Sequence, residues 1–144
     1  MRISREEYLM REAWNASLRS SCLRLQVGAI LSRDGRVVVT GYNGSLSGLD
    51  HCTPLTCNPT TPCTATVHAE VNCVYFAARL GISTHGTFMY TTDSPCRKCA
   101  EAIIQSGVSV VIYDREYRDT EPLGLLRYAG IVVDRLEIFD AKGR

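Results

Sequence analysis

The chain is 144 residues long, 45% hydrophobic and 22% charged, with a formal net charge of +1. These values fit one folded domain over residues 1–144 with room for a sizeable core. The near-neutral balance argues against an extended nucleic-acid footprint, and no apolar run approaches the length of a membrane span.

The chain also carries signals about its compartment. Its first residues, Met-Arg-Ile-Ser-Arg-Glu-Glu, lack the apolar stretch of a signal peptide, so we expect a cytoplasmic protein. Thiols stay reduced in the cytosol, and the chain has seven cysteines, an odd number. This pattern favours metal ligands over a disulfide framework.

The first part of the chain predicts a helix and a β-hairpin. Ser4 precedes Glu7 at the spacing of a capping box, so we expect a helix to begin there. Short apolar strands over 27–31 and 37–42 flank Asp34–Gly35, a dipeptide typical of two-residue hairpin turns.

The rest of the chain alternates between helical and strand patterns. The last three predicted strands are joined by helices, so we expect them to be parallel. The whole order predicts an α/β fold: a three-layer α/β/α arrangement with a five-stranded mixed sheet and helices on both faces. The expected segments are a Gly/Pro-rich loop over 41–66, a helix over 71–80 closed by Gly81, a strand over 87–92, a helix with Ser94 as N-cap and Pro95 as first residue that stops at Gly107, a strand over 108–113, a polar loop over 114–121, a helix over 122–129 and a strand over 131–139.

Two short motifs carry the chemistry. The first is His68-Ala69-Glu70, and the second is Pro95-Cys96-Arg97-Lys98-Cys99. One imidazole and two thiolates can occupy three corners of a zinc tetrahedron and leave the fourth for water. Glu70 is too close to His68 to be a comfortable fourth ligand, and it can instead carry protons beside the open corner.

Each motif has a simpler explanation when taken alone. An isolated H-x-E is weak, because a histidine at a helix start is usually a cap or a surface residue. An isolated C-x-x-C can be a redox pair or half of a structural zinc site. In this order, with a proline before the first cysteine, the two motifs resemble the signature of zinc-dependent nucleobase deaminases.

Further motifs make the sequence similar to the deoxycytidylate (dCMP) deaminase family over nearly its whole length. The Gly-Tyr-Asn-Gly run is the discriminating piece, because free-cytidine and tRNA adenosine deaminases are not expected to have it. Cys73 departs from the family, which more often has Ala there, and we interpret it as a small core residue. The motifs are Val27-Gly28-Ala29, Gly41-Tyr42-Asn43-Gly44, His68-Ala69-Glu70-Val71-Asn72, Ser94-Pro95-Cys96-x-x-Cys99 and Ile104-Gln105-Ser106-Gly107.

The resemblance implies hydrolysis of dCMP to dUMP and ammonia, which would feed thymidylate synthesis. His68, Cys96 and Cys99 match the ligands of the catalytic zinc, and Glu70 matches the proton shuttle between the attacking water and the cytosine ring. The Ala69 N–H would meet the pyrimidine 2-oxo group.

Other residues match the parts of the family site that hold the rest of the nucleotide. The Ser94 carbonyl would meet the 4-amino group, and Asn43 matches a residue that holds the deoxyribose 3′-hydroxyl. Asn43 can also be explained as a turn residue that tolerates the left-handed conformation, and Tyr117 either as a sugar-phosphate contact or as an exposed loop tyrosine. For the phosphate, Arg24 is the first choice and Arg118 the second; the alternatives are Arg19, Arg97, Lys98 and Arg115.

Four more cysteines suggest a second metal. Cys22, Cys52, Cys57 and Cys63 make a four-thiolate set suited to a closed structural zinc, and they resemble a second site of bacterial and phage members of the family. His51 can replace one of them. The alternative is four unrelated small residues, which would leave the long loop without an anchor.

The family resemblance also implies regulation. Its members are typically homo-hexamers, activated by dCTP with Mg²⁺ and inhibited by dTTP, and Gly44 would let backbone N–H groups approach an effector anion. The alternative is an unregulated enzyme in which the glycines only make a tight turn. Competing functions are deamination of dCTP, of a modified dCMP, or of bases in tRNA or single-stranded DNA. A further alternative is a zinc-bearing scaffold without catalytic activity. The intact Glu70 argues against a scaffold, because a structural zinc site does not need that carboxylate.

Overall fold

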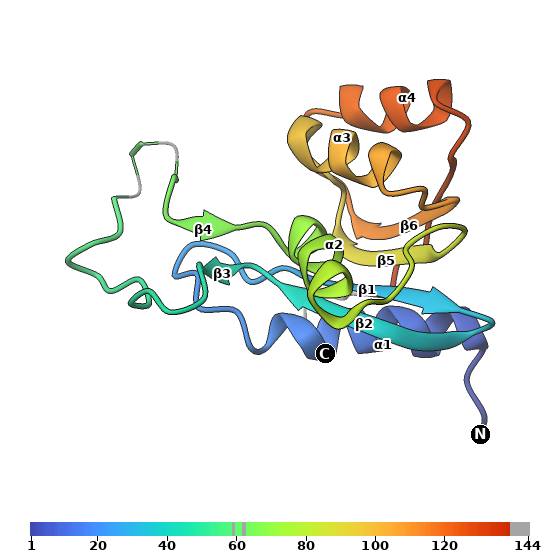
Figure 1. The fold of residues 1–144 in the computed structure, drawn as a ribbon, viewed down its shortest axis with the longest axis horizontal. Helices are drawn as coiled ribbons and strands as arrows, with labels where there is room; N and C mark the ends of the chain where they lie inside the picture. The colour runs from blue at the N-terminus through green and yellow to red at the C-terminus, as the bar shows by residue number, and fades with distance from the viewer. Residues whose placement is uncertain (59, 62, 139–144) are drawn as a thin grey trace.

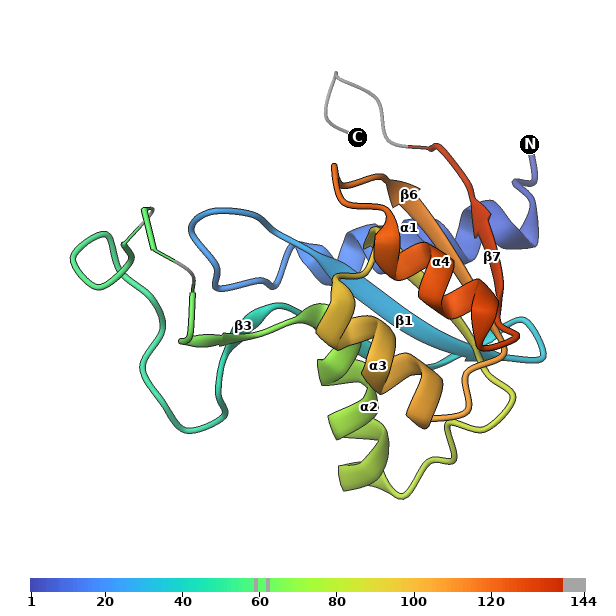
Figure 2. The same ribbon diagram turned by 90° about the horizontal axis from the view of Figure 1, so that it is seen from above.

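We describe a computed structural model of the chain, in which residues 1–58, 60–61 and 63–138 are described. Its main element is a five-stranded sheet in the order β2-β1-β5-β6-β7. Figure 1 shows α1 on one face of this sheet and α3 and α4 on the other, and Figure 2 shows the same layers from above. The expected α/β fold with helices on both faces is therefore confirmed. The bounds are α1 Arg5–Ser17, β1 Gly28–Arg33, β2 Arg36–Tyr42, β3 Gly44–Ser45, β4 Thr66–Val67, α2 Ala69–Leu80, β5 Phe88–Asp93, α3 Arg97–Gln105, β6 Val110–Arg115, α4 Glu121–Tyr128 and β7 Val132–Arg135.

The sheet is mixed, as the connections predict. β1 pairs antiparallel with both β2 and β5, whereas β5, β6 and β7 pair in parallel. Parallel strands need crossover connections, and α3 and α4 supply them. None of the helices in the described part of the chain is long and apolar enough to cross a membrane.

Two apolar clusters fill the space on either side of the sheet. On β1, Ile30 packs against α1, while its neighbours Ala29 and Leu31 pack against the other cluster, which includes residues of α2, α3 and α4. This alternation follows from the two-residue period of a strand. The sheet is thus buried on both faces and forms a rigid platform.

The N-terminal half follows the local signals closely. The Ser4 Oγ accepts the Glu7 N–H at 3.0 Å, which confirms the start of α1. Asp34 and Gly35 both have positive φ, 55° and 72°, as a two-residue hairpin turn requires. Gly81 caps α2 with φ of 70°.

Two boundary predictions around the second motif and the β6 end are wrong. α3 begins at Arg97 with Cys96 as its N-cap, not with Ser94. The reason is that the Ser94 N–H donates to the Arg115 carbonyl in the sheet, and its Oγ accepts the Tyr117 N–H. Asp114, expected in a polar loop, is buried within β6, where its carboxylate accepts the indole N–H of Trp14.

The last strand is also shorter than expected. β7 covers Val132–Arg135, whereas the prediction extended to residue 139, which lies outside the described residues. The long loop has a base that the sequence did not indicate, because β3 and β4 pair antiparallel and close it. Both views show the loop extending away from the sheet beyond this pair (Figures 1 and 2).

Candidate metal centre and nucleotide pocket

The two chemical motifs meet at the starts of α2 and α3. His68 is the N-cap of α2 and Cys96 the N-cap of α3, and Cys99 lies in the first turn of α3. The His68 Nδ1 is 3.5 Å from the Cys96 Sγ and 3.4 Å from the Cys99 Sγ. The positive ends of both helices point at this cluster, which favours thiolates there.

This triangle fits a tetrahedral zinc ion. With Zn–S bonds of about 2.3 Å and Zn–N bonds of about 2.1 Å, ligand atoms in a tetrahedron lie about 3.6 Å apart. The observed distances match that edge closely. Among the described residues, His68, Cys96 and Cys99 are the one group of histidine, cysteine and acidic side chains whose ligand atoms cluster tightly enough for a metal ion.

The three candidate ligands differ in their tendency to hold a proton. Hydrogen bonds from Cys99 and His68 lower the pKa of Cys96 to about 3. The bond to Cys96, together with burial, raises the pKa of Cys99, and the bond to Cys96 also raises the pKa of His68. Because a metal needs both thiols deprotonated and a neutral imidazole, binding would release protons.

Glu70 lies in the same pocket and is almost fully buried, at 4% exposure. Burial raises the pKa of its carboxyl to about 7. A carboxyl with a pKa near neutrality can both accept and donate a proton at physiological pH, which suits a proton shuttle.

A cavity of about 370 Å³ surrounds these groups. It is large enough for a small ligand such as a nucleotide. Its walls combine the metal cluster with acidic, basic and aromatic side chains. Of the residues that the sequence singled out, the lining contains Cys22, Arg24, Asn43, Cys63, His68, Ala69, Glu70, Cys96 and Tyr117.

Ala69, the first residue of α2, offers the pocket a backbone donor. Its side chain is fully buried, and among the described residues no side chain caps this helix start. The first N–H groups of a helix have no partner within the helix, so the Ala69 N–H is available to a ligand.

Asn43 lines the pocket but also ties the neighbouring chain together. Its Oδ1 accepts the Val27 N–H at 2.8 Å and the Ser20 hydroxyl at 2.6 Å, and its Nδ2 donates to the Leu25 carbonyl at 2.7 Å. One Nδ2 hydrogen remains for a ligand. The sequence suggested a substrate contact or a turn residue, and it gave no sign of this scaffold role.

The arginines considered as phosphate ligands differ in whether they line the pocket and whether they are engaged in ion pairs. Arg24 is exposed and lines the pocket, where its Nη2 donates to the Thr61 carbonyl at 2.8 Å. Arg118 is exposed but is not part of the lining. Arg115 pairs with Asp93, and Arg97 pairs with Glu121 at 2.9 Å.

The structure does not gather the four remaining cysteines. Cys22 and Cys63 line the pocket, whereas no metal-binding group within the described residues includes Cys22, Cys52, Cys57 or Cys63. The arrangement as it stands therefore does not fit a second closed site. His51, the expected substitute ligand, lines a different cavity.

That second cavity, of about 670 Å³, is larger but lies away from the metal cluster. Gly44 lines it, and a Cβ there would lie 2.8 Å from the Ser21 Oγ. Three basic side chains, Arg19, His51 and Arg79, also line it.

Sequence reasoning did not assign Asp93, Asp119 or Pro122 to the site, yet all three line the first pocket. The position of Asp93 next to Ser94 was a usable signal. Asp119 and Pro122 had no local signal, because the β6–α4 connection brings them over the site.

Comparisons with known proteins agree with this site. A family model described as the cytidine and deoxycytidylate deaminase zinc-binding region matches residues 3–114. The chain is 39% identical over 150 aligned positions to ComE operon protein 2 of Bacillus subtilis, covering 99% of this chain and 79% of that protein. It is 35% identical to the deoxycytidylate deaminase of Saccharomyces cerevisiae over 92% of this chain, but it spans only 45% of the yeast protein.

A solved structure shows the same similarity in three dimensions. The crystal structure of dCMP deaminase from the cyanophage S-TIM5 in complex with dCMP and dUMP superimposes with a TM-score of 0.85. The two chains are 32% identical, and the match covers 94% of this chain and 99% of the phage chain.

Proposed function

The chain belongs to the family of zinc-binding cytidine and deoxycytidylate deaminases, and from that premise we propose that it hydrolyses dCMP to dUMP and ammonia. The observation that carries this proposal is the His68–Cys96–Cys99 triangle with Glu70 buried in the same cavity. The dCMP deaminase names of relatives at 32–35% identity support the choice of substrate.

The residues divide the work as follows. His68, Cys96 and Cys99 would hold zinc, which would supply hydroxide near neutral pH. Glu70 would take one proton from the attacking water and deliver it to N3 of cytosine as the water oxygen bonds to C4. It would then move the remaining proton of the new C4 hydroxyl to the 4-amino group, so that the C4–N bond breaks and the products are dUMP and ammonia. Its pKa of about 7 lets it perform both transfers.

The remaining contacts orient the nucleotide. The Ala69 N–H binds the 2-oxo group, the Ser94 carbonyl accepts the 4-amino group, and the free Nδ2 hydrogen of Asn43 meets the 3′-hydroxyl. Tyr117 lies over the sugar, and Arg24 binds the phosphate at the open side of the pocket, with Arg118 as the second cation. Arg24 is the better placed of the two, since it lines the cavity.

We propose two further properties of the assembly and its metals. Regulation by dCTP with Mg²⁺ and by dTTP, in a homo-hexamer, is supported by the second cavity, where Gly44 and three basic side chains would receive a triphosphate. A second zinc on Cys22, Cys52, Cys57 and Cys63 is supported by the donor chemistry of the set and requires the loop to close on the metal.

The experiment is a substrate panel. Ammonia release is measured from dCMP, CMP, dCTP, deoxycytidine and a cytosine-containing single-stranded oligonucleotide, and Glu70→Gln serves as the background control. We expect dCMP to give the highest kcat/KM. Turnover confined to dCTP or to the oligonucleotide would replace dCMP as the substrate and leave the deaminase chemistry in place.

A further inference from the structure

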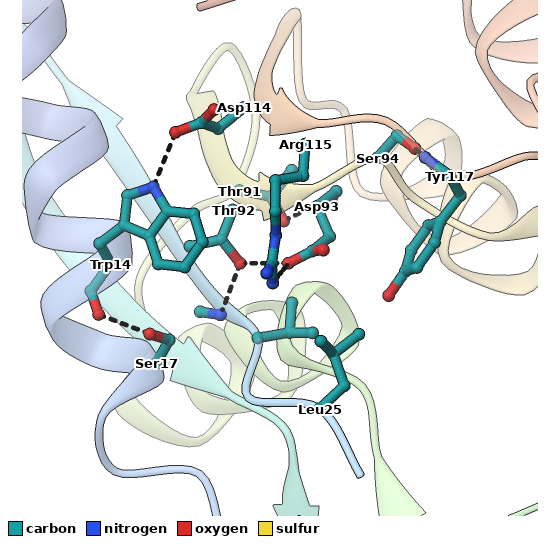
Figure 3. Close-up of polar contacts among 12 residues, drawn as sticks. Trp14, Ser17, Leu25, Thr91, Thr92, Asp93, Ser94, Asp114, Arg115 and Tyr117 are labelled. Carbon is teal, nitrogen blue, oxygen red and sulfur yellow. Dashed lines mark hydrogen bonds and ion pairs between the residues drawn. The ribbon is translucent and has the colours of Figure 1, made fainter. Parts of the chain in front are cut away.

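A partly buried ion pair lies at the wall of the pocket, with the Asp93 side chain 5% exposed and the Arg115 side chain 31% exposed. Asp93 and Arg115 end the parallel strands β5 and β6 at the same register position. The Arg115 Nη2 donates to the Asp93 Oδ1 at 2.9 Å, and the Thr92 hydroxyl donates to the same oxygen at 2.7 Å. Figure 3 shows this pair, and the whole Asp93 residue is 4% exposed and lines the cavity.

The arginine of this pair is held from behind by α1. Its Cζ lies 4.8 Å from the centroid of the Trp14 ring, within the range of a cation–π contact. The Trp14 Nε1 in turn donates to the buried carboxylate of Asp114 at 2.8 Å. The guanidinium therefore has a fixed place between α1 and Asp93 (Figure 3).

The same strand ends carry two residues assigned above to the substrate. The Ser94 N–H donates to the Arg115 carbonyl at 2.8 Å, and the Tyr117 N–H donates to the Ser94 Oγ at 2.9 Å. Burial and the charge of Asp93 raise the pKa of Tyr117, as expected when the phenol lies near that carboxylate. Hydrogen bonds therefore connect the Asp93–Arg115 ion pair, Ser94 and Tyr117 into one unit.

We propose that the Asp93–Arg115 pair is a positioning element that fixes Ser94 and Tyr117 relative to the metal cluster. The pair does not touch the reacting atoms and acts through these two residues. A misplacement of about 1 Å at a substrate-orienting group can cost about 100-fold in rate, so the rigidity of this wall matters for turnover. The kinetic part of this inference rests on the proposed deamination, whereas the structural part does not.

The test combines amide hydrogen exchange with kinetics. The variants are Asp93→Asn, Arg115→Gln, Arg115→Lys and the double variant Asp93→Asn/Arg115→Gln. The matched control is Arg11→Gln. It removes an exposed ion pair on α1, in which the Arg11 Nη2 lies 2.7 Å from the Glu7 Oε1. Zinc content and Tm are recorded for each protein, so that a general loss of folding is recognised.

We expect faster exchange of the Ser94 and Tyr117 amides in Asp93→Asn and Arg115→Gln, by about tenfold or more, with slow exchange retained in β1. kcat for the cytosine nucleotide should fall about 10- to 100-fold, more than KM rises. The double variant should be no worse than the poorer single one, because the pair acts as a unit, and Arg115→Lys should recover part of kcat. Arg11→Gln should match the wild type.

Other results would contradict either the positioning role or the proposed function. Unchanged exchange at Ser94 and Tyr117 overturns the proposal, and so does faster exchange without any change in kcat or KM of an active enzyme. A wild-type protein that deaminates no cytosine nucleotide refutes the proposed function, and the exchange data then decide the positioning role alone. Additive losses in the double variant also count against a single unit.

Discussion

At the scale of single residues, burial controls the protonation of Glu70. The carboxyl is 4% exposed, and burial raises its pKa from the usual 4.5 to about 7. A raised pKa means that the folded chain binds this proton more tightly than the unfolded chain does. The stability that comes from the bound proton is therefore complete below pH 4.5 and is lost as pH rises through 7.

This sign gives a prediction for protein stripped of metal by a chelator. Wild type should lose stability between pH 5 and pH 8 relative to Glu70→Gln, by up to roughly 3 kcal/mol, because the amide cannot ionise. The measurement is urea unfolding of both proteins at the two pH values. A difference that does not change with pH would mean that Glu70 does not hold this proton in the folded chain.

Arg24 allows a second test at the residue scale. It lines the pocket and is exposed, with its guanidinium bonded to the Thr61 carbonyl. Arg24→Ala should raise KM for dCMP about tenfold or more and leave any weak activity on deoxycytidine unchanged, since only the phosphate contact is lost. Equal losses on both substrates would assign Arg24 to loop anchoring and move the phosphate elsewhere.

At the scale of elements, close contact between β2 and α2 sets the place of the metal cluster. A Cβ at Gly41 would lie 2.5 Å from the Ala69 carbonyl oxygen and 2.9 Å from the Cys73 backbone nitrogen. Only glycine therefore lets α2 approach the sheet, and α2 carries His68 at its N-cap and Glu70 in its first turn.

Gly41→Ala should destabilise the protein by about 1–3 kcal/mol and weaken zinc binding, because the added methyl group pushes the start of α2 away from α3. Gly124→Ala is the matched control, since nothing lies within 4 Å of a Cβ there and Gly124 is in an exposed helical position. Alanine should be neutral or slightly stabilising at that site. Tm and zinc affinity are measured for both; equal Tm values would contradict the packing argument.

The elements also show how far the sequence could predict the site. The α1 cap, the hairpin turn and the Gly81 stop depend on neighbours within a few residues, so local patterns were enough. Ser94 was misassigned because its partners, Arg115 and Tyr117, lie more than twenty residues away. Asp119 reaches the pocket only through the turn from β6 into α4, which no local pattern indicates.

At the scale of the whole molecule, the loop between β3 and β4 extends away from the sheet (Figures 1 and 2). Its described part contains short turns, such as the Thr53–Thr56 bonds, and it carries Cys52, Cys57 and Cys63. Two zinc ions per chain are expected by elemental analysis if this loop closes on a metal, and Cys57→Ser should then lower Tm while the catalytic centre keeps its ion. One zinc ion per chain in fully active protein would remove the second site.

The second cavity leads to a prediction for the assembly. Its basic side chains and Gly44 lie beside exposed apolar residues, Leu46 and Tyr75, which suit a subunit contact. Initial rates against dCMP should be sigmoidal, become hyperbolic with dCTP and Mg²⁺, and steepen with dTTP, from a hexamer in solution. A hyperbolic curve indifferent to both nucleotides, from a monomer, would exclude this regulation.

In the proposed reaction, Glu70 moves protons beside a zinc ion that His68, Cys96 and Cys99 would hold. The most direct measurement is the rate of ammonia release from dCMP by wild type and by Glu70→Gln, each with its zinc content. We expect Glu70→Gln to keep the wild-type zinc content and to lose at least about 10²–10⁴-fold in kcat. Near-normal turnover by a zinc-replete Glu70→Gln protein would contradict this role of Glu70.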